Sequence, residues 1–457
     1  MGRKRIVTYL RKLDETDKKV ARAQSAATAG EAAFGAFSDG KVVVVGLGYV
    51  GLPLAIALAG KFDTCGFDID RGRIAELGEG RDRTREIEHE RLLASALALT
   101  DADASIPASE FIIVTVPTPI DARNRPDLTI VEAASRTAAK VLQRSAGKGR
   151  PPVVIYESTV YPGVTEEICG PILEAESGLV CGRDFFLGYS PERINPGDRE
   201  HTIDKITKVV SGQTPEVLDR VAALYGAITS GGVYRAASIK AAEAAKVIEN
   251  AQRDINIAFV NEITRIFSRL DLSVYDVLEA AGTKWNFLDF TPGLVGGHCI
   301  GVDPYYLSHR AAQLGIDAKV VIAGRGTNDS MAEWIADELH AARGEQPGSV
   351  LVLGLTFKEN VPDLRNSKVI DVIFRLEQRG HKVTVHDPLA DAAEAAHEYE
   401  VELAQRELQG QYDLVLLAVP HREYLDLGAE GLRKHVAEGG TLADLKNALK
   451  GGVDWTL

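Results

Sequence analysis

The stretch KVVVVGLGYVGLPLAIALAGKFDTCGFDID, from Lys41 to Asp70, decides the fold class of this chain. Its four consecutive valines predict a buried strand, and the glycines that follow predict a tight turn. The apolar run GLPLAIALA then predicts a helix, and TCGF predicts a second strand. Strand, helix and strand in this order form a βαβ unit, from which parallel sheets are built.

The turn of this unit carries three glycines, Gly46, Gly48 and Gly51, in the pattern G-x-G-x-x-G. Directly after a strand and before a helix, this pattern predicts a dinucleotide site. The glycines let the backbone approach a pyrophosphate, which binds the free N–H groups of the helix N-terminus. Tyr49 and Val50 lie within the turn and are predicted to contact the cofactor too. A glycine turn that binds nothing is the alternative.

The second strand of the unit ends in an acid, Asp68, about 20 residues after the turn. A carboxylate at this place accepts hydrogen bonds from ribose hydroxyls and repels a 2′-phosphate, so NAD is favoured over NADP. Arg71 and Arg73 follow closely and weaken that choice. Arg73 could equally lie along the adenosine, and we count it among the predicted cofactor-binding residues.

The same plan returns near the C-terminus, in SVLVLGLTFKENVPDLRNSKVIDVIFRLEQRGHKVTVHDP. This segment again predicts strand, glycine turn, helix and a strand that ends at Asp387. A later strand closes at Pro117 in the first half and at Pro420 in the second. Two Rossmann-like, doubly wound parallel-sheet domains are therefore expected. In the second turn Lys358 replaces the glycine pattern, which indicates a different anionic ligand or simple packing.

Between the two halves, residues 236–270 contain neither proline nor glycine and are apolar at helical spacing. They predict one helix of about 30 residues within a helical middle domain. Such a helix could join two domains, and its apolar face could also pair subunits. The predicted divisions are a helical or flexible N-terminal extension, a first α/β domain, a central helical domain and a second α/β domain, at residues 1–38, 39–232, 233–342 and 343–457.

Composition excludes several classes of protein. The net charge of −13 argues against nucleic-acid binding, which needs concentrated Lys and Arg. Four scattered cysteines without a C-x-x-C pair indicate neither a disulfide framework nor a zinc site, so no metal is expected. No apolar run approaches the roughly 18–20 residues of a membrane span, and the start lacks the apolar block of a secretory signal. Cytoplasm is the predicted compartment.

Four polar residues stand where chemistry could occur. Lys246 and Asn250 lie four apart on the long helix and share one face. Glu157, in VVIYESTV, and Thr118, in VTVPTP, follow apolar strands and so lie at the carboxyl edge of a parallel sheet, where ligands bind. A solvated helix face and a turn-capping glutamate are the plainer alternatives.

The stretch VGGHCIGVD adds Cys299, preceded by the glycine pair Gly296–Gly297 and followed after four residues by Asp303. The glycines permit unusual dihedral angles and leave room for a ligand, and Asp303 could hold a water beside the sulfur. On residue type alone, a buried inert cysteine is the commoner outcome. A metal site with His298 lacks further ligands at suitable spacing.

From about residue 39 to the C-terminus, these separated motifs resemble the family of UDP-sugar and GDP-mannose 6-dehydrogenases. The resemblance implies oxidation of a sugar C6 alcohol to a carboxylate with two NAD. It assigns Cys299 as the nucleophile, with Lys246, Asn250, Asp303, Glu157 and Thr118 as its catalytic partners. Glu157 and Thr118 are also expected at the cofactor. For the nucleotide sugar, the resemblance indicates Lys246, Asn250, Gly296, Lys358 and Arg365.

Within the family, SPERINPGD and KWNFLDFTPGLVGGHCIGVDPYYL are similar to the branch that acts on UDP-N-acetylhexosamines, UDP-GlcNAc or UDP-GalNAc. That branch makes uronates for capsule, O-antigen or other surface polysaccharides. Its members often carry proline and a basic residue where this chain has Asp289 and Thr291, and Lys284 is a possible substitute for the basic contact. UDP-glucose, UDP-ManNAc and GDP-mannose remain alternative substrates. From the apolar face of the long helix, we also expect a homodimer through the central helix, or a higher oligomer.

The mechanism implied by the resemblance is covalent. Lys246, Asn250 and a water held by Asp303 assist the first oxidation, and Cys299 then adds to the aldehyde. The thiohemiacetal is oxidised to a thioester, which water hydrolyses with Glu157 or Asp303 as base. Two rivals stay open: a one-step NAD dehydrogenase of the hydroxyacid type, and an inactive nucleotide-sugar-binding subunit.

Overall fold

The computed structural model describes residues 40–193, 204–297, 300–404 and 407–457. The chain divides into two compact units, residues 1–247 and 248–457. The division falls inside the long helix α8, Ile239–Ser268, which is 30 residues long, as the sequence predicted. The predicted domain boundaries at 232 and 342 stay predictions. The N-terminal extension, 1–38, lies outside the described residues.

The first unit contains an eight-stranded sheet in the order β3-β2-β1-β4-β5-β6-β7-β8. Neighbouring strands are parallel except β6 and β7, which pair antiparallel. The strands are β1 Val42–Val45, β2 Thr64–Phe67, β3 Ala98–Thr100, β4 Phe111–Val114, β5 Val153–Tyr156, β6 Phe186–Tyr189, β7 Lys208–Gly212 and β8 Val233–Arg235. All four valines of β1 are buried, because helices cover both faces of the sheet.

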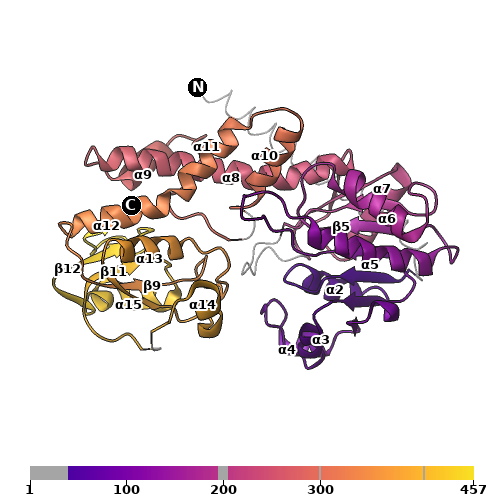
Figure 1. Cartoon of the computed structure of the whole chain (residues 1–457), viewed down its shortest axis with the longest axis horizontal. Coiled ribbons are helices and arrows are strands. Elements are labelled where there is room, and N and C mark those ends of the chain that lie inside the picture. The colour runs from indigo at the N-terminus through magenta and orange to yellow at the C-terminus, as the bar shows by residue number, and fades with distance from the viewer. Residues whose placement is uncertain (1–39, 194–203, 298–299, 405–406) are drawn as a thin grey trace, which may run out of the picture. The chain divides into compact units, whose positions relative to one another are not determined.

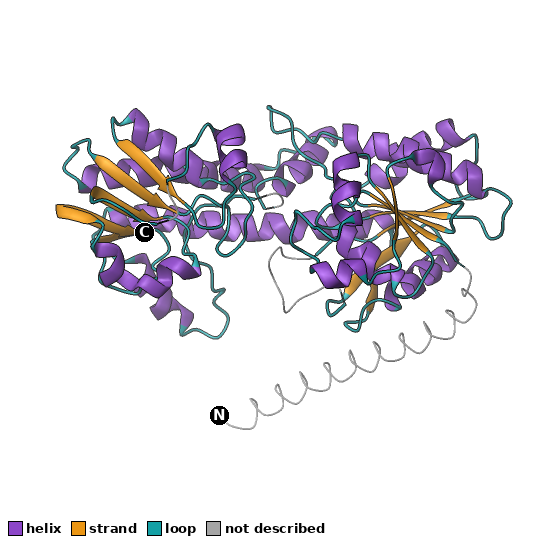
Figure 2. Ribbon diagram, turned by 90° about the horizontal axis from the view of Figure 1, so that it is seen from below, coloured by secondary structure: helices purple, strands orange, loops and turns teal. Residues whose placement is uncertain are grey.

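Helices α2, Gly51–Ala59, and α7, Pro215–Gly226, pack on one face, in a cluster with Val42, Val44 and Ile113. Helix α5, Thr129–Ser145, packs on the other face, where its Ser135 hydroxyl hydrogen-bonds the Tyr156 hydroxyl at 2.7 Å. The remaining helical segments are α3 Arg71–Gly78, α4 His89–Leu93, η1 Asp103–Ser105, η2 Thr165–Cys169 and α6 Gly170–Ser177. Figure 2 shows the orange strands between purple helices.

The second unit contains a five-stranded parallel sheet in the order β10-β9-β11-β12-β13. The strands are β9 Ser349–Leu353, β10 Lys382–His386, β11 Tyr412–Leu417, β12 Val436–Asp444 and β13 Trp455–Thr456. Helices α12, Met331–Ala342, and α13, Val369–Gln378, cover one face, and α15, Arg422–Arg433, covers the other. Figure 1 draws this unit in orange to yellow and labels β9, β11, β12, α12, α13 and α15. The other helices are α9 Val274–Gly282, α10 Asp303–Gln313, α11 Lys319–Asp329 and α14 Ala392–Tyr399.

This architecture confirms the prediction of two Rossmann-like domains with a helical middle. Both β1 and β9 lie inside their sheets, each followed by a glycine turn, as the repeated sequence plan required. Among the described residues no helix is long and apolar enough to cross a membrane.

Candidate active site

The glycine turn after β1 needs glycine for two different reasons. A Cβ on Gly51 would overlap the Gly46 carbonyl oxygen and the Thr115 hydroxyl, so Gly51 is required by the fold itself. A Cβ on Gly48 would meet no protein atom within 4 Å. The open space beside Gly48 fits a ligand that approaches the backbone closely, as a dinucleotide pyrophosphate does. The turn therefore suits the cofactor that the sequence predicted.

The carboxylate of Asp68, just after the end of β2, hydrogen-bonds the backbone of this turn. One of its oxygens accepts a hydrogen bond from the Leu47 N–H at 2.7 Å, and the other accepts from the Asp70 N–H at 2.9 Å. Both contacts are to backbone, so the carboxylate lies beside the glycine turn, where a cofactor ribose would bind.

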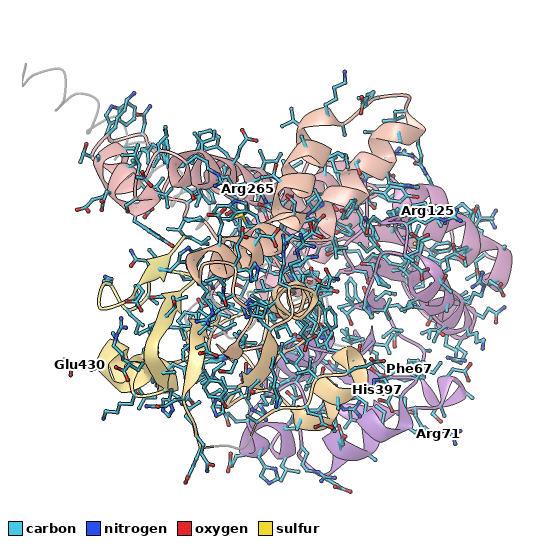
Figure 3. All side chains as sticks on the ribbon, turned by 60° about the vertical axis from the view of Figure 1, so that its left-hand side comes forward. Phe67, Arg71, Arg125, Arg265, His397 and Glu430 are labelled. Carbon is cyan, nitrogen blue, oxygen red and sulfur yellow. The ribbon has the colours of Figure 1, made fainter. Side chains whose placement is uncertain are left out.

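Arg73, a predicted cofactor contact, is buried, and its side chain hydrogen-bonds the backbone of the glycine turn. Its Nε donates to the Leu47 carbonyl at 2.9 Å, and its Nη2 pairs with Asp82 at 2.7 Å. The guanidinium thus has a structural task that the sequence did not indicate, and its role at the cofactor stays a prediction. Arg71, by contrast, is exposed at the outside of α3 and pairs with Asp101 at 3.3 Å (Figure 3).

The loops after β4 and β5 are tied together by two hydroxyl groups. Thr118 donates to the Thr159 carbonyl at 2.6 Å, and Ser158 donates to the Val116 carbonyl at 2.6 Å. Because β4 and β5 are parallel neighbours, their carboxyl ends meet at one edge of the sheet. The structure therefore brings Thr118 and the start of the Glu157 segment together, as expected.

The Glu157 side chain itself is buried in an ion pair. Its carboxylate binds the ammonium group of Lys208, and both side chains are inaccessible to solvent. The second carboxylate near this ammonium group is Glu192, at 3.6 Å. Lys208 opens β7, and because β7 runs antiparallel to β6, its first residue lies at the carboxyl edge of β5.

Burial and charge compete within this ion cluster. Burial raises the pKa of Glu157 to about 7, although the Lys208 cation lowers it, and the nearby Glu192 carboxylate raises it further. Burial alone lowers the pKa of Lys208, but the two carboxylates outweigh burial and the net shift is upward. The cluster therefore keeps Lys208 charged.

Lys246 contacts the loop that carries Glu192. Its Nζ donates a buried hydrogen bond to the Glu192 main-chain carbonyl at 2.7 Å. One turn earlier on α8, Glu243 accepts from the N–H groups of Gly163 and Thr165, at 2.6 and 2.9 Å. These contacts fix the first turns of α8 against the loops that follow β5 and β6.

Asn250 and Asp303, two members of the predicted catalytic set, contact each other directly. The Asn250 side-chain amide donates to the Asp303 carboxylate at 2.5 Å, and both side chains are buried. Asp303 is the first residue of α10. Cys299 and His298, which precede it, lie outside the described residues.

The glycine pair before Cys299 packs closely against other residues of the second unit. A Cβ on Gly296 would lie 2.5 Å from the Asn366 carbonyl oxygen, and the Gly297 N–H donates to that same oxygen at 3.2 Å. A Cβ on Gly297 would lie 2.9 Å from the Phe357 ring. Protein atoms therefore fill the space on the Cβ side of both glycines, and the predicted contact of Gly296 with the sugar stays a prediction.

The acid at the turn of the second βαβ unit, Asp387, has a histidine partner in addition to its backbone partners. Asp387 accepts from the N–H groups of Leu355 and Thr356, at 2.6 and 3.0 Å, much as Asp68 accepts from Leu47. The buried His421 ring also contacts the Asp387 carboxylate, at 3.1 Å. A ribose would have to compete with this imidazole, which gives a reason why the second domain should not bind NAD in the same way.

The two predicted basic residues of this domain lie on the segment between β9 and α13. Lys358 is half-buried, and Arg365 is exposed and pairs with Asp363 at 2.8 Å. Their contact with a nucleotide sugar stays a prediction.

Three family models match successive parts of the chain. They are the NAD binding domain, the central domain and the UDP binding domain of the UDP-glucose/GDP-mannose dehydrogenase family, at residues 40–229, 240–330 and 351–451. The chain belongs to this family. It is an NAD-dependent nucleotide-sugar dehydrogenase, and the sequence-based predictions of family, cofactor and UDP-sugar binding are confirmed.

Individual proteins resemble the chain over most of its length. A UDP-N-acetyl-D-glucosamine 6-dehydrogenase of Pseudomonas aeruginosa is 51% identical, over 90% of this chain and 97% of its own. Protein CapL of Staphylococcus aureus is 52% identical, over 84% and 91%. The solved structure of a UDP-D-ManNAc dehydrogenase from Pyrococcus horikoshii has a TM-score of 0.79 at 28% identity, over 91% and 98%.

Sequence reasoning about this dehydrogenase missed Lys208, Glu192 and Tyr225, which surround Glu157. A lysine at the start of a strand ordinarily lies at an exposed edge, so its type and position carried no signal. A strand that reverses direction within a parallel sheet also has no local signature. An aligned set of sequences could have revealed the pairing of Lys208 with the two acids through covariation.

Proposed function

We propose that this dehydrogenase oxidises the C6 hydroxyl group of UDP-N-acetylglucosamine to the uronate in two steps. The relative from Pseudomonas aeruginosa, named for this substrate, supports the choice of the N-acetylated sugar. UDP-GalNAc, UDP-ManNAc, UDP-glucose and GDP-mannose are the alternatives. A uronate linked to UDP suits a glycosyl transfer that builds a polysaccharide, as the motifs of the sequence predicted.

The observation that carries the proposal is the buried hydrogen bond from Asn250 to Asp303. It joins the predicted catalytic face of α8 to the helix that begins just after the Cys299 segment. A site for alcohol oxidation needs a group that removes the hydroxyl proton and donors that hold the oxygen. Lys246 and Asn250 supply these donors, and a water on Asp303 takes the proton.

The glycine turn and Asp68 would hold NAD, which would supply the acceptor for one hydride in each of the two oxidations. In the first step C6 loses a hydride and its hydroxyl group loses a proton, which leaves the aldehyde. The Cys299 thiolate then adds to the aldehyde carbon, and the oxygen takes a proton to form a thiohemiacetal. Loss of a second hydride and a proton converts this adduct into a thioester.

Water then cleaves the C–S bond, which releases the carboxylate and restores the thiol. Of the two predicted bases for this water, we favour Asp303, because the Glu157 carboxylate is held in an ion pair by Lys208, whereas Asp303 is bound by a neutral amide. Thr118, whose hydroxyl group binds the Thr159 carbonyl, holds the loop after β5 beside the cofactor edge.

The decisive experiment measures NADH formed per nucleotide sugar consumed, for the five candidate substrates. The proposal expects two NADH per UDP-GlcNAc and the highest kcat/KM for that sugar. One NADH per substrate would support the hydroxyacid-type rival, and saturable binding without NADH would support an inactive binding subunit. Uronate release by Cys299→Ala at the wild-type rate would exclude the covalent route.

We also propose that the enzyme forms a homodimer through α8. Three large apolar side chains of this helix are exposed in the single chain, Ile248, Phe259 and Ile266, at 53, 60 and 50%. A helix with so much exposed apolar surface gains stability when a second copy covers it. The cytoplasmic location stays a prediction from the sequence.

A further inference from the structure

The buried ion cluster of the first unit consists of Glu157, Glu192 and Lys208 and lies directly behind the predicted catalytic lysine. These three residues come from the end of β5, the loop after β6 and the start of β7. The Lys208 side chain is inaccessible to solvent and binds the Glu157 carboxylate, with Glu192 at 3.6 Å. Lys208 and Lys246 both contact Glu192. Lys208 lies near its side-chain carboxylate, and Lys246 donates to its main-chain carbonyl.

A lysine is rarely buried completely, because removing its charge from water costs several kcal/mol unless partners compensate. Lys208 is compensated by two carboxylates and by the Tyr225 ring of α7, whose centroid lies 5.2 Å from Nζ. Burial raises the pKa of a further acid, Glu86, to about 6, and the Asp82 and Glu192 carboxylates add to this shift. Three side chains from three different parts of the chain therefore surround one ammonium group. These contacts restrain the start of the loop after β6, where Glu192 lies.

The carbonyl of Glu192 is the acceptor for the Lys246 ammonium group, at 2.7 Å. A lysine side chain has four rotatable bonds, so the position of its nitrogen depends on how firmly its hydrogen-bond acceptor is held. Because Lys208 restrains the Glu192 side chain, it also restrains the carbonyl of the same residue.

We propose that Lys208 is a positioning residue that acts through Glu192 on the catalytic Lys246. Its ammonium group anchors the Glu157 and Glu192 carboxylates and thereby fixes the carbonyl that orients Lys246 for the first oxidation. Glu157 belongs to this support and is not the base for water. The proposal rests on the role of Lys246 in the proposed function.

The test compares Lys208→Met and Lys208→Arg in the full-length enzyme. Lys208→Met removes the charge at similar length, and we expect kcat to fall about 100-fold, a magnitude typical of a displaced catalytic group. The KM for NAD should change less than about twofold, because the glycine turn and Asp68 are untouched. Lys208→Arg keeps the charge and should restore most of kcat.

The matched control is Arg220→Met, which breaks a largely buried pair at the opposite edge of the same sheet. Arg220 binds Glu110, the residue just before β4, at 3.0 Å. Both variants should lower Tm, since each leaves a carboxylate without its cation. Only Lys208→Met should lower kcat per folded enzyme. Equal kcat in the two folded variants would overturn the proposal.

A double-mutant cycle decides whether Lys208 acts through Lys246. If it does, adding Lys208→Met to Lys246→Met causes little further loss of kcat, whereas independent effects multiply. Multiplied losses would overturn the proposal. Should Lys208→Met fail to fold, Glu192→Gln takes its place in the cycle, because it keeps the carbonyl and removes the charge that Lys208 binds.

The two proposals fail in different ways. A wild-type kcat in Lys246→Met would overturn the proposed function and this inference together. A wild-type kcat in Lys208→Met, beside a strongly impaired Lys246→Met enzyme, would overturn this inference alone.

Discussion

The Asn250 amide and the Asp303 carboxylate, 53 residues apart in the chain, meet in a buried hydrogen bond of 2.5 Å. The amide can donate only from its nitrogen, so the bond requires Asp303 to accept. Asp303 is 1% exposed, and water does little to screen its charge. A charge introduced at residue 250 would therefore act directly on the Asp303 carboxylate.

Replacing Asn250 by Asp places a second carboxylate against Asp303. Two carboxylates at this distance cannot both ionise, so one pKa of the pair rises and a proton is shared. We expect kcat at pH 8 to fall by about 100-fold or more, with partial recovery as the pH is lowered and the proton bridge forms. The pH profile of kcat from pH 5.5 to 9 measures this.

Asn256→Asp is the control for that change, because Asn256 lies on the same helix and its amide binds only the Gln252 carbonyl among its described hydrogen bonds. Its kcat should follow the wild-type pH profile. A flat, uniformly low profile for Asn250→Asp, without recovery at low pH, would contradict the shared-proton explanation.

The second and third glycines of the turn, Gly48 and Gly51, should respond differently to alanine. Gly51→Ala forces a Cβ into the Gly46 carbonyl, so we expect a loss of several degrees in Tm without any ligand. Gly48→Ala meets no protein atom, so its Tm should stay within about a degree while the Kd for NAD rises at least tenfold. Differential scanning fluorimetry and NAD titration distinguish the two. Unchanged NAD affinity in Gly48→Ala would argue against a pyrophosphate beside that residue.

Asp387 should make the second domain sensitive to acid. Burial alone would raise the pKa of Asp387, but His421 and two backbone N–H groups outweigh burial and hold it well below its usual range. A depressed carboxyl pKa stabilises the fold at pH values above the unfolded pKa of about 3.9, and this stability is lost as pH falls below it.

Asp387→Asn should therefore lower the free energy of unfolding at pH 7 by about 2–4 kcal/mol, because the buried His421 contact is weakened. It should also flatten the dependence of stability on pH between pH 5 and 3. Urea unfolding at several pH values measures both effects. A variant as stable as wild type at pH 7 would show that the carboxylate charge contributes little.

Phe259 should be essential to the dimer that we propose. Its side chain is 60% exposed on α8, and Phe259→Glu places a charge where a second copy would otherwise bury a ring. We expect this variant to elute as a monomer in size-exclusion chromatography with light scattering, while wild type elutes as a dimer. Tyr234→Glu, an equally exposed aromatic position on β8, is the control and should not alter the mass. A wild-type mass for Phe259→Glu would place the interface elsewhere.

Local sequence was sufficient for the repeated βαβ plan, the 30-residue helix and the glycine turn with its strand-end acid. Each of these depends on residues close together in the chain: apolar periodicity selects helix or strand, and glycine permits the turn. The catalytic nucleophile was inferred from family resemblance, and Cys299 lies outside the residues that the structure describes.

Only the tertiary structure decided what the glycines at 296 and 297 accommodate, and what Glu157 touches. Asn366 and Phe357 reach the glycine pair from about 60 to 70 residues away, which no local pattern records. Lys208 reaches Glu157 because β7 runs antiparallel to β6, so the first residue of one strand lies beside the last residues of its neighbours. Strand direction is set by packing across the whole sheet, and for that reason the partner of Glu157 could not be found from the sequence alone.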